Sequence, residues 1–190
     1  MSSQKLGTKM EIGTYIPNFE EVEKQCDILS QAGIKFIELD HLVLSSRSEK
    51  QLEKLSRCLR EGGIRVWSVH APFGGENDLS ILGEEKRRKA VFSHREIVDK
   101  LSFFGCKIMV IHSGGKAKKE EEKARFDSLR RSMEKLLAFS QEKGIRLALE
   151  NMPPHHLAGK VEDLRRLIGE FNSSHLGICF DTGHSHIRGK

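Results

Sequence analysis

EKGIRLALE (142–150) is one of four closely similar phrases in this chain; the others are QAGIKFIEL (31–39), EGGIRVWSV (61–69) and FFGCKIMVI (103–111). Each phrase joins the end of a polar stretch to a glycine and then to a run of large apolar side chains. A glycine at that point can adopt the left-handed conformation that ends a helix without a Cβ penalty. The apolar run that follows has the length and composition of a strand buried on both faces, as in a parallel sheet. Each phrase therefore predicts a helix, a glycine stop and a buried strand.

The same alternation continues along the whole chain. Apolar runs expected to be strands occur at MEIGTYI (10–16), IKFIELD (34–40), IRVWSVH (64–70), KIMVIH (107–112), IRLALE (145–150) and LGICFD (176–181). Segments with apolar residues at three- and four-residue spacing predict helices between them, over 19–31, 49–61, 86–104, 120–143 and 161–171. Strands that alternate with helices indicate an α/β fold with a parallel sheet and right-handed crossovers. No G-x-G-x-x-G follows the first run, so nothing supports a dinucleotide-binding sheet.

Composition narrows the class of protein. A chain of 190 residues, 37% hydrophobic and 31% charged, suits one soluble domain over 1–190. Its apolar runs are far shorter than the roughly 18 residues of a membrane span, and the N-terminus lacks the apolar region of a secretion signal, so a cytoplasmic protein without a membrane partner is expected. Four widely spaced cysteines are expected to be reduced. The net charge of +5 suits an anionic substrate such as a sugar phosphate, and it equally suits a nucleic-acid backbone.

Four consecutive predicted strands end on a residue able to bind a metal: His70, His112, Glu150 and Asp181. Side chains at the carboxyl ends of barrel strands point into one shared bowl, where barrel enzymes keep their active sites. His184 follows at the start of the next predicted loop and can reach the same bowl. Any one of these histidines alone could be an ordinary core or capping residue, but the repeated strand-end position favours a metal site. This arrangement also favours a TIM (β/α) barrel over an open doubly wound sheet.

The residue types limit the choice of metal. Imidazole nitrogens combined with carboxylate oxygens suit Zn²⁺, Mn²⁺, Co²⁺ or Fe²⁺ and disfavour a site built for Mg²⁺ or Ca²⁺ alone. The cofactor expected from the residues is therefore a divalent transition metal or zinc.

Four motifs at these strand ends resemble a known group: VHAPF (69–73), IHSGG (111–115), LENMP (149–153) and FDTGH (180–184). Together they are similar to the xylose-isomerase-like barrel superfamily, which joins sugar and sugar-phosphate isomerases and epimerases to the endonuclease IV type of abasic-site DNA repair enzymes. The resemblance extends from the first strand to His184.

The isomerase branch implies that Glu150 and Asp181 are two of four ligands to one catalytic metal, either Mn²⁺, Co²⁺, Mg²⁺ or Zn²⁺. It also implies that Glu150 moves a proton at the carbon next to a carbonyl, which the metal polarises. The endonuclease branch implies one zinc on His70, His112 and Glu150, a second zinc shared by Glu150 and Asp181, and a third on His184. Those ions would activate water for phosphodiester cleavage.

The sequence departs from both branches in its length. It ends at Lys190, directly after the sixth unit, whereas a full eight-unit barrel takes about 250 residues. We therefore expect about six of eight βα units, a truncated barrel without the ligands of the last two strands, and a possible self-association through unpaired strands.

Three further residues are candidates for substrate binding. Glu38 ends the second strand and is expected to line the pocket or to mark a polar strand end. Asn151 is expected to orient substrate or to hold its loop. Lys116 closes the phrase SGGK (113–116), which resembles a loose phosphate cradle, although such glycine loops are common. Trp67 is expected in the core, and His156 in solvent.

Three functions follow, in this order. The first is a divalent-metal-dependent isomerase or epimerase of a small sugar or sugar phosphate. The second is a zinc-dependent abasic-site DNA endonuclease, the only hypothesis with a nucleic-acid partner; it is ranked lower because the short loops offer no counterpart to fuller DNA-contacting loops. The third is an inactive partial barrel.

Overall fold

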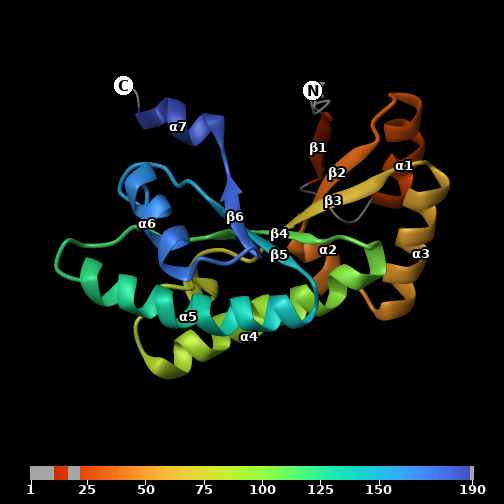
Figure 1. Ribbon diagram of the computed structural model, residues 1–190. Helices are drawn as coiled ribbons and strands as arrows, with labels where there is room; N and C mark the ends of the chain where they lie inside the picture. Colours follow the sequence, from red (N-terminus) through yellow and green to blue (C-terminus); the bar gives the residue numbers. More distant parts are fainter. Residues whose placement is uncertain (1–10, 17–21, 189–190) are drawn as a thin grey trace, which may run out of the picture.

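The computed structural model of the chain describes residues 11–16 and 22–188 (Figure 1). Its strands are β1 (Gly13–Ile16), β2 (Phe36–Asp40), β3 (Arg65–His70), β4 (Ile108–His112), β5 (Arg146–Glu150) and β6 (Leu176–Cys179). Its α-helices are α1 (Val22–Gln31), α2 (His41–Ser45), α3 (Glu49–Glu61), α4 (Glu84–Lys100), α5 (Glu122–Glu142), α6 (Val161–Phe171) and α7 (Thr182–Arg188). The predicted alternation of strands and helices is confirmed.

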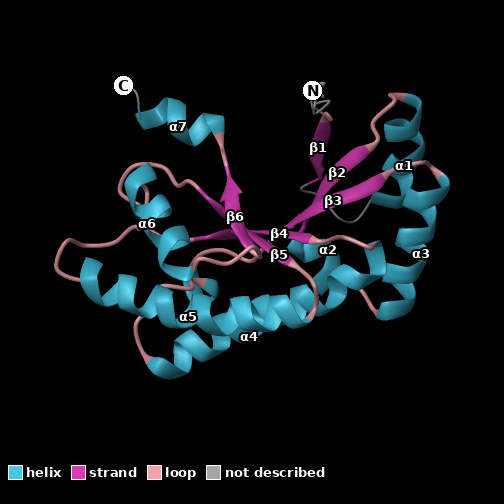
Figure 2. Ribbon diagram, in the orientation of Figure 1, coloured by secondary structure: helices cyan, strands magenta, loops and turns pink. Residues whose placement is uncertain are grey.

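The strands form one parallel sheet in the order β1-β2-β3-β4-β5-β6 (Figure 2). Each strand lies beside its neighbour in sequence, which is the order of a (β/α) barrel and not of a doubly wound sheet. Within the part of the chain that the structure describes, β1 and β6 each pair on one side only, so the sheet is not closed. The expected α/β fold with six barrel-type units is confirmed.

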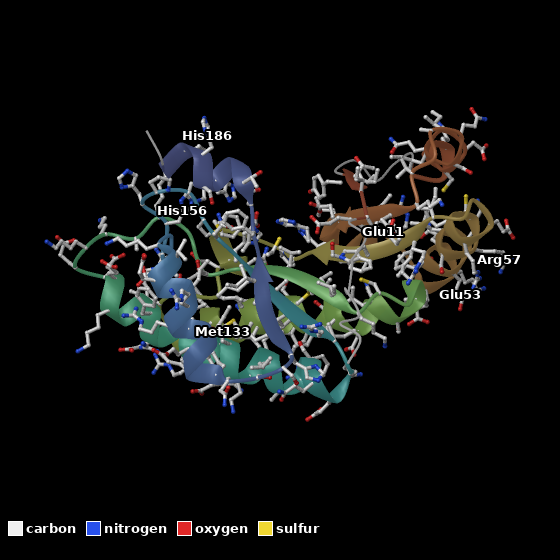
Figure 3. All side chains as sticks on the ribbon, turned by 45° about the horizontal axis from the view of Figure 1, so that its top comes forward. Glu11, Glu53, Arg57, Met133, His156 and His186 are labelled. Atoms are coloured by element: carbon white, nitrogen blue, oxygen red, sulfur yellow. The ribbon has the colours of Figure 1, made fainter. Side chains whose placement is uncertain are left out.

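One face of the sheet is covered by helices and carries the hydrophobic core. Alternate strand residues on this face are almost completely buried: Ile37, Leu39, Met109, Ile111, Leu147 and Leu149. They pack in one cluster with apolar residues of the helices, among them Met133 of α5, which is labelled in Figure 3 and is fully buried. This packing fixes the register of the sheet, because a slip by one residue would move every one of these side chains to the other face.

The opposite face carries the polar strand residues, and some of its large side chains remain accessible. Tyr15, Glu38 and Ser68 are paired across β1, β2 and β3 and line an open pocket together with Trp67. The Trp67 side chain is 54% exposed, so the expectation that it belongs to the core is wrong. The physical reason is that the described residues place no second layer over this face.

Two short helices were not evident in the sequence. Helix α2 directly follows β2, and Asp40 begins it by accepting the main-chain N–H of Leu42. Helix α7 follows β6 and contains His184, which was expected in a loop. The long helix expected over 86–104 is instead α4 followed by a 3₁₀ turn over Leu101–Phe104. Part of the first predicted strand and helix, residues 10 and 19–21, lies outside the described residues.

Two expectations drawn from composition can be compared with the structure. None of the four cysteines forms a disulfide bond in the structure. None of the described helices combines the length and the apolar character that crossing a membrane would require.

Candidate metal centre

The carboxyl ends of the parallel strands bring the predicted ligands to one edge of the sheet. His70, His112 and Glu150 are the last residues of β3, β4 and β5, and His112 pairs directly with Glu150 in the sheet register. Asp181 lies two residues beyond the end of β6, and His184 lies in the first turn of α7. All five side chains line the same pocket, which also includes Glu38.

Two imidazoles meet the Glu150 carboxylate on one side. His70 Nε2 lies 3.0 Å from His112 Nε2. Glu150 Oε2 lies 3.0 Å from His112 Nε2 and 3.7 Å from His70 Nε2. Two nitrogens and one oxygen therefore converge within a space that one divalent cation could occupy.

Asp181 and His184 meet the same carboxylate on its other side. The ligand atoms of Glu150, Asp181 and His184 lie within 4.8 Å of one another. His184 Nδ1 is 3.6 Å from Glu150 Oε1, but it is only 2.7 Å from the main-chain oxygen of Asn151, to which it donates a hydrogen bond. That bond places the proton on Nδ1, so the Nε2 lone pair of His184 is the atom available to a metal or a substrate.

The chemistry of the donor set fits a divalent cation. Glu150 is 4% exposed, and its buried Oε2 receives no hydrogen bond from the described residues. A buried carboxylate oxygen without a donor is costly, and a bound cation removes that cost. The short approach of two imidazole nitrogens has the same explanation, because both can direct a lone pair at one ion. Three imidazoles and two carboxylates fit zinc or a transition metal better than Mg²⁺ or Ca²⁺.

Negative charge surrounds His70 and alters its pKa. Burial by itself lowers the pKa of His70, but the hydrogen bond and the charge of Glu38, with the charges of Glu150 and Asp40, outweigh it and raise the pKa above its ordinary value. His70 Nδ1 is 2.9 Å from Glu38 Oε1. The Tyr15 ring meets the His70 ring edge-on, and the Tyr15 hydroxyl donates to Asp40 Oδ2 at 2.5 Å.

Asn151 holds the turn that carries the last two predicted ligands. Its Oδ1 accepts the main-chain N–H of Asp181 at 2.7 Å, and its Nδ2 donates to the main-chain oxygen of Asp181 at 2.9 Å and to Ser185 Oγ at 3.2 Å. The Asn151 side chain is buried and is not among those that line the pocket. Of the two roles expected for it, substrate orientation and loop support, the contacts favour loop support.

The glycine loop after β4 also has a structural role, because it packs against the segment that follows β3. The Gly115 N–H donates to Asp78 Oδ2 at 3.0 Å, and a Cβ at Gly114 would lie 2.3 Å from Ser80 Oγ. These contacts tie the loop to the segment after β3 and leave no open cradle for a phosphate. The Lys116 side chain is exposed and does not line the pocket, so the structure does not bring this predicted substrate residue to the site.

The pocket has a volume of about 570 Å³, and several of its wall residues were missed. Phe73, Met152, Pro153 and Cys179 line it, and so does His156, which was expected in solvent. His156, labelled in Figure 3, lies in the loop between β5 and α6, where an antiparallel bridge joins it to Lys116. Of these residues, only Cys179 could have been identified from the sequence, because it lies two residues before Asp181 and strand residues two apart share a face. The structure pairs it with Glu150.

Cys179 is a poor nucleophile in this setting. Burial, followed by the charges of Glu150, Glu38 and Asp181, raises the pKa of its thiol to about 12. A thiol with so high a pKa stays protonated at neutral pH. Cys179 therefore contributes shape to the pocket and no thiolate.

The comparisons with known proteins agree with this fold. An uncharacterised protein of Sinorhizobium fredii is 24% identical over 190 aligned residues, which cover 87% of this chain and 61% of that protein. A probable endonuclease 4 of Mycoplasma mobile is 32% identical over 91 residues, covering 47% of this chain and 32% of that protein. The chain thus spans less than two thirds of the length of these curated relatives.

Solved structures of sugar epimerases superpose well. The apo 3-keto-D-glucoside 4-epimerase from E. coli gives a TM-score of 0.80 at 20% identity, covering 94% of this chain and 71% of that one. The D-psicose 3-epimerase from Clostridium cellulolyticum H10, solved with D-tagatose, gives 0.83 at 16% identity, covering 94% and 65%. At these identities the likeness shows the fold. Residues 26–190 match the family described as the xylose isomerase-like TIM barrel, and the chain belongs to that family.

Proposed function

We propose that this chain is a divalent-metal-dependent isomerase or epimerase of a small sugar or sugar phosphate, and that residues 1–190 form one barrel domain acting in the cytoplasm. The observation that carries the proposal is the buried Glu150 carboxylate, which lies between two groups of metal-ligand atoms in one pocket. A carboxylate in that position can both hold a cation and reach a bound substrate.

The proposed reaction requires residues that bind the cation and a residue that transfers the proton. Glu150 and Asp181, with His184, would hold one cation, and His70 and His112 would hold a second cation on the other side of Glu150. A bound divalent cation would supply Lewis-acid polarisation of a substrate carbonyl. Glu150 would then take the proton from the carbon next to the carbonyl and deliver it to the carbonyl carbon on the same face, which isomerises the sugar. Epimerisation would need a second acid on the opposite face of the substrate to return the proton there. Burial of Glu150 keeps water away from this transfer.

The pocket suits a small polar substrate. A volume of about 570 Å³ lies within the range for small-molecule sites. Its walls combine the apolar surfaces of Phe73 and Met152 with imidazoles and carboxylates, which suits the mixed apolar and hydroxyl surface of a sugar. Two of the structural neighbours are sugar epimerases, which supports the same substrate class.

The test is exchange of substrate hydrogen with solvent. The full chain, loaded with Mn²⁺ or Co²⁺, is incubated with ketohexoses and their phosphates in D₂O, and NMR follows deuterium at the carbons next to the carbonyl. We expect exchange with the unaltered chain, and a loss of about 10²- to 10⁴-fold with Glu150→Gln. Glu142→Gln, an exposed carboxylate of α5, is the control that should exchange normally. Metal binding without any exchange would contradict the isomerase assignment.

The group formed by His70, His112 and Glu150 favours a second candidate function. Two imidazoles and one carboxylate are a common ligand set for catalytic zinc, and this group and the Asp181 group share Glu150. Two relatives that are probable endonucleases of type 4 add support for this candidate, a zinc-dependent abasic-site endonuclease. Nicking of an abasic-site duplex by the zinc-loaded chain, with two or more zinc ions bound, would establish it.

A further inference from the structure

Both oxygens of the Glu38 carboxylate are engaged by neighbouring side chains. Glu38 Oε1 lies 2.9 Å from His70 Nδ1, and Glu38 Oε2 accepts the Ser68 hydroxyl at 2.5 Å. Glu38 was expected to contact substrate, and it does lie in the pocket wall. Its hydrogen bonds instead direct it at His70.

The sheet register makes this arrangement possible. Glu38 pairs with Ser68, and two residues further along Asp40 pairs with His70. The register between β2 and β3 shifts by one residue between Ile37 and Glu38. As a result, Ser68 and His70 of β3 point to the same face of the sheet as Glu38 of β2. A carboxylate placed between them can accept a bond from each, and its orientation is then fixed by two contacts.

The Glu38 contact determines which nitrogen of His70 carries the proton. A carboxylate accepts only, so His70 Nδ1 must be the protonated nitrogen. Nε2 of the neutral ring then keeps its lone pair, and this is the atom that lies 3.0 Å from His112 Nε2 and 3.7 Å from Glu150 Oε2. Carboxylates that bond the outer nitrogen of a ligating histidine orient the ring and raise its basicity, and their loss typically weakens metal binding 10- to 100-fold.

We propose that Glu38, held in place by Ser68, is a positioning residue that fixes the orientation and tautomer of His70 for a divalent cation bound with His112 and Glu150. The proposal rests on the divalent-metal binding of the proposed function. It concerns only the cation at His70, His112 and Glu150 and does not depend on which substrate the pocket takes. Glu38 is then neither a substrate ligand nor a metal ligand.

The neighbouring carboxylate provides a matched control. Asp40 lies on the same face of the same strand, near His70, and accepts hydrogen bonds from the Tyr15 hydroxyl and the Leu42 N–H. It makes no hydrogen bond to the His70 ring and acts on it chiefly through charge, an effect typically worth about two- to threefold in affinity for a partly exposed pair. Asp40→Asn thus removes a nearby negative charge without removing a bond to the ring.

The experiment titrates the metal-free full chain and its variants with Zn²⁺ against a competing chelator, and records the absorption spectrum with Co²⁺. We expect Glu38→Ala to bind Zn²⁺ 10- to 100-fold more weakly, Glu38→Gln and Ser68→Ala to lie between it and the unaltered chain, and Asp40→Asn to change affinity by less than about threefold. The Co²⁺ spectrum should change with Glu38→Ala and not with Asp40→Asn. Long-range ¹H–¹⁵N spectra of the metal-free chain, at a pH where the ring is neutral, should show His70 with its proton on Nδ1 and a mixture of tautomers in Glu38→Ala.

The outcomes separate this inference from the proposed function. Equal Zn²⁺ affinities for the unaltered chain and all Glu38 variants would overturn it, while hydrogen exchange on sugars could still succeed. Failure of sugar exchange, with the graded Zn²⁺ affinities intact, would remove the isomerase assignment and leave the role of Glu38 in place. If Glu38→Ala fails to fold, the conservative Glu38→Gln variant decides by the same measurements. A loss of affinity as large in Asp40→Asn as in Glu38→Ala would overturn the inference too.

Discussion

His184 Nδ1 lies 2.7 Å from the main-chain oxygen of Asn151, and the Asn151 side chain in turn holds both main-chain polar groups of Asp181. The buried asparagine at the end of β5 therefore builds the turn that follows β6. Because Glu150 precedes Asn151, the two strands are fastened at the point where their candidate ligands meet.

Replacement of Asn151 should loosen that turn. Asn151→Ala removes three hydrogen bonds at a buried position and leaves the main-chain N–H of Asp181 without its acceptor, so we expect a loss of about 1–3 kcal/mol in the free energy of unfolding. Metal affinity should fall as well, since Asp181 and His184 lose their anchor. Denaturant unfolding of the metal-free chain and Zn²⁺ titration measure the two effects. Ser185→Ala, which removes only the 3.2 Å bond, is the control; an equal effect of both changes would contradict the assigned role.

A buried ion pair supports the other side of the pocket. Arg125 Nη2 lies 2.5 Å from Asp78 Oδ2, both residues are at most 8% exposed, and Arg125 also donates to the main-chain oxygen of Lys116. Asp78 additionally accepts the Gly115 N–H. The pair therefore joins the loops after β3 and β4.

Breaking this pair from one side should be costly. We expect Arg125→Met to lower the free energy of unfolding by about 3–5 kcal/mol, because Asp78 is left buried without its counter-charge. Arg130→Met removes a surface pair with Glu170 and should cost less than about 1 kcal/mol. Chemical denaturation compares the two. A small loss for Arg125→Met, similar to that of Arg130→Met, would show that water or another group compensates Asp78.

The sequence contained enough information for the fold because its signals are local and repeated. Each glycine after a helix, such as Gly105 and Gly144, takes a positive φ in the structure, as the four phrases required. The convergence of His70, His112 and Glu150 was also predictable, since the ends of parallel strands share one edge.

Other features depend on contacts that no local pattern encodes. Helix α2 has five residues, too few for a recognisable period, and it depends on the Asp40 cap. The pocket residues Phe73 and His156 come from loops whose paths are set by distant contacts, such as the bridge between His156 and Lys116. The segment SGGK (113–116) has the composition of a phosphate-binding loop, but the main-chain N–H of Gly115 donates its hydrogen bond to the buried Asp78 carboxylate.

The last strand exposes apolar surface at the edge of the sheet. Ile178 is 49% exposed on β6, which pairs only with β5 among the described strands. Unpaired edges with apolar side chains promote association, so we expect concentration-dependent self-association by sedimentation velocity. Ile178→Lys should weaken it at least about tenfold, since burying an isoleucine contributes about 1.5–3 kcal/mol. Ile28→Lys, at a 66% exposed position of α1, is the control. A monomer at all concentrations would contradict this prediction.

His94 should make the stability of the chain depend on pH. It lies in α4, is 1% exposed and donates from Nδ1 to the Ala90 carbonyl oxygen at 2.8 Å. Burial lowers the pKa of His94 to about 4; the Ala90 hydrogen bond opposes this shift, and the positive charge that His112 and His41 would carry adds to it. The folded chain therefore favours the neutral ring.

The sign of the effect follows from proton binding. Below a pH of about 6.5 the unfolded chain protonates His94 while the folded chain does not, so stability falls as the pH drops from 6.5 toward 4, by up to about 3 kcal/mol, and is unaffected by this group above 6.5. Denaturant unfolding of metal-free protein at pH 7.5 and pH 4.5 tests this. His94→Leu should lose about 2 kcal/mol less between these two conditions than the unaltered chain. An identical pH dependence in His94→Leu and the unaltered chain would contradict this prediction. It would mean that the His94 ring is already protonated in the folded chain at pH 4.5, stabilised there by a counter-charge or by water.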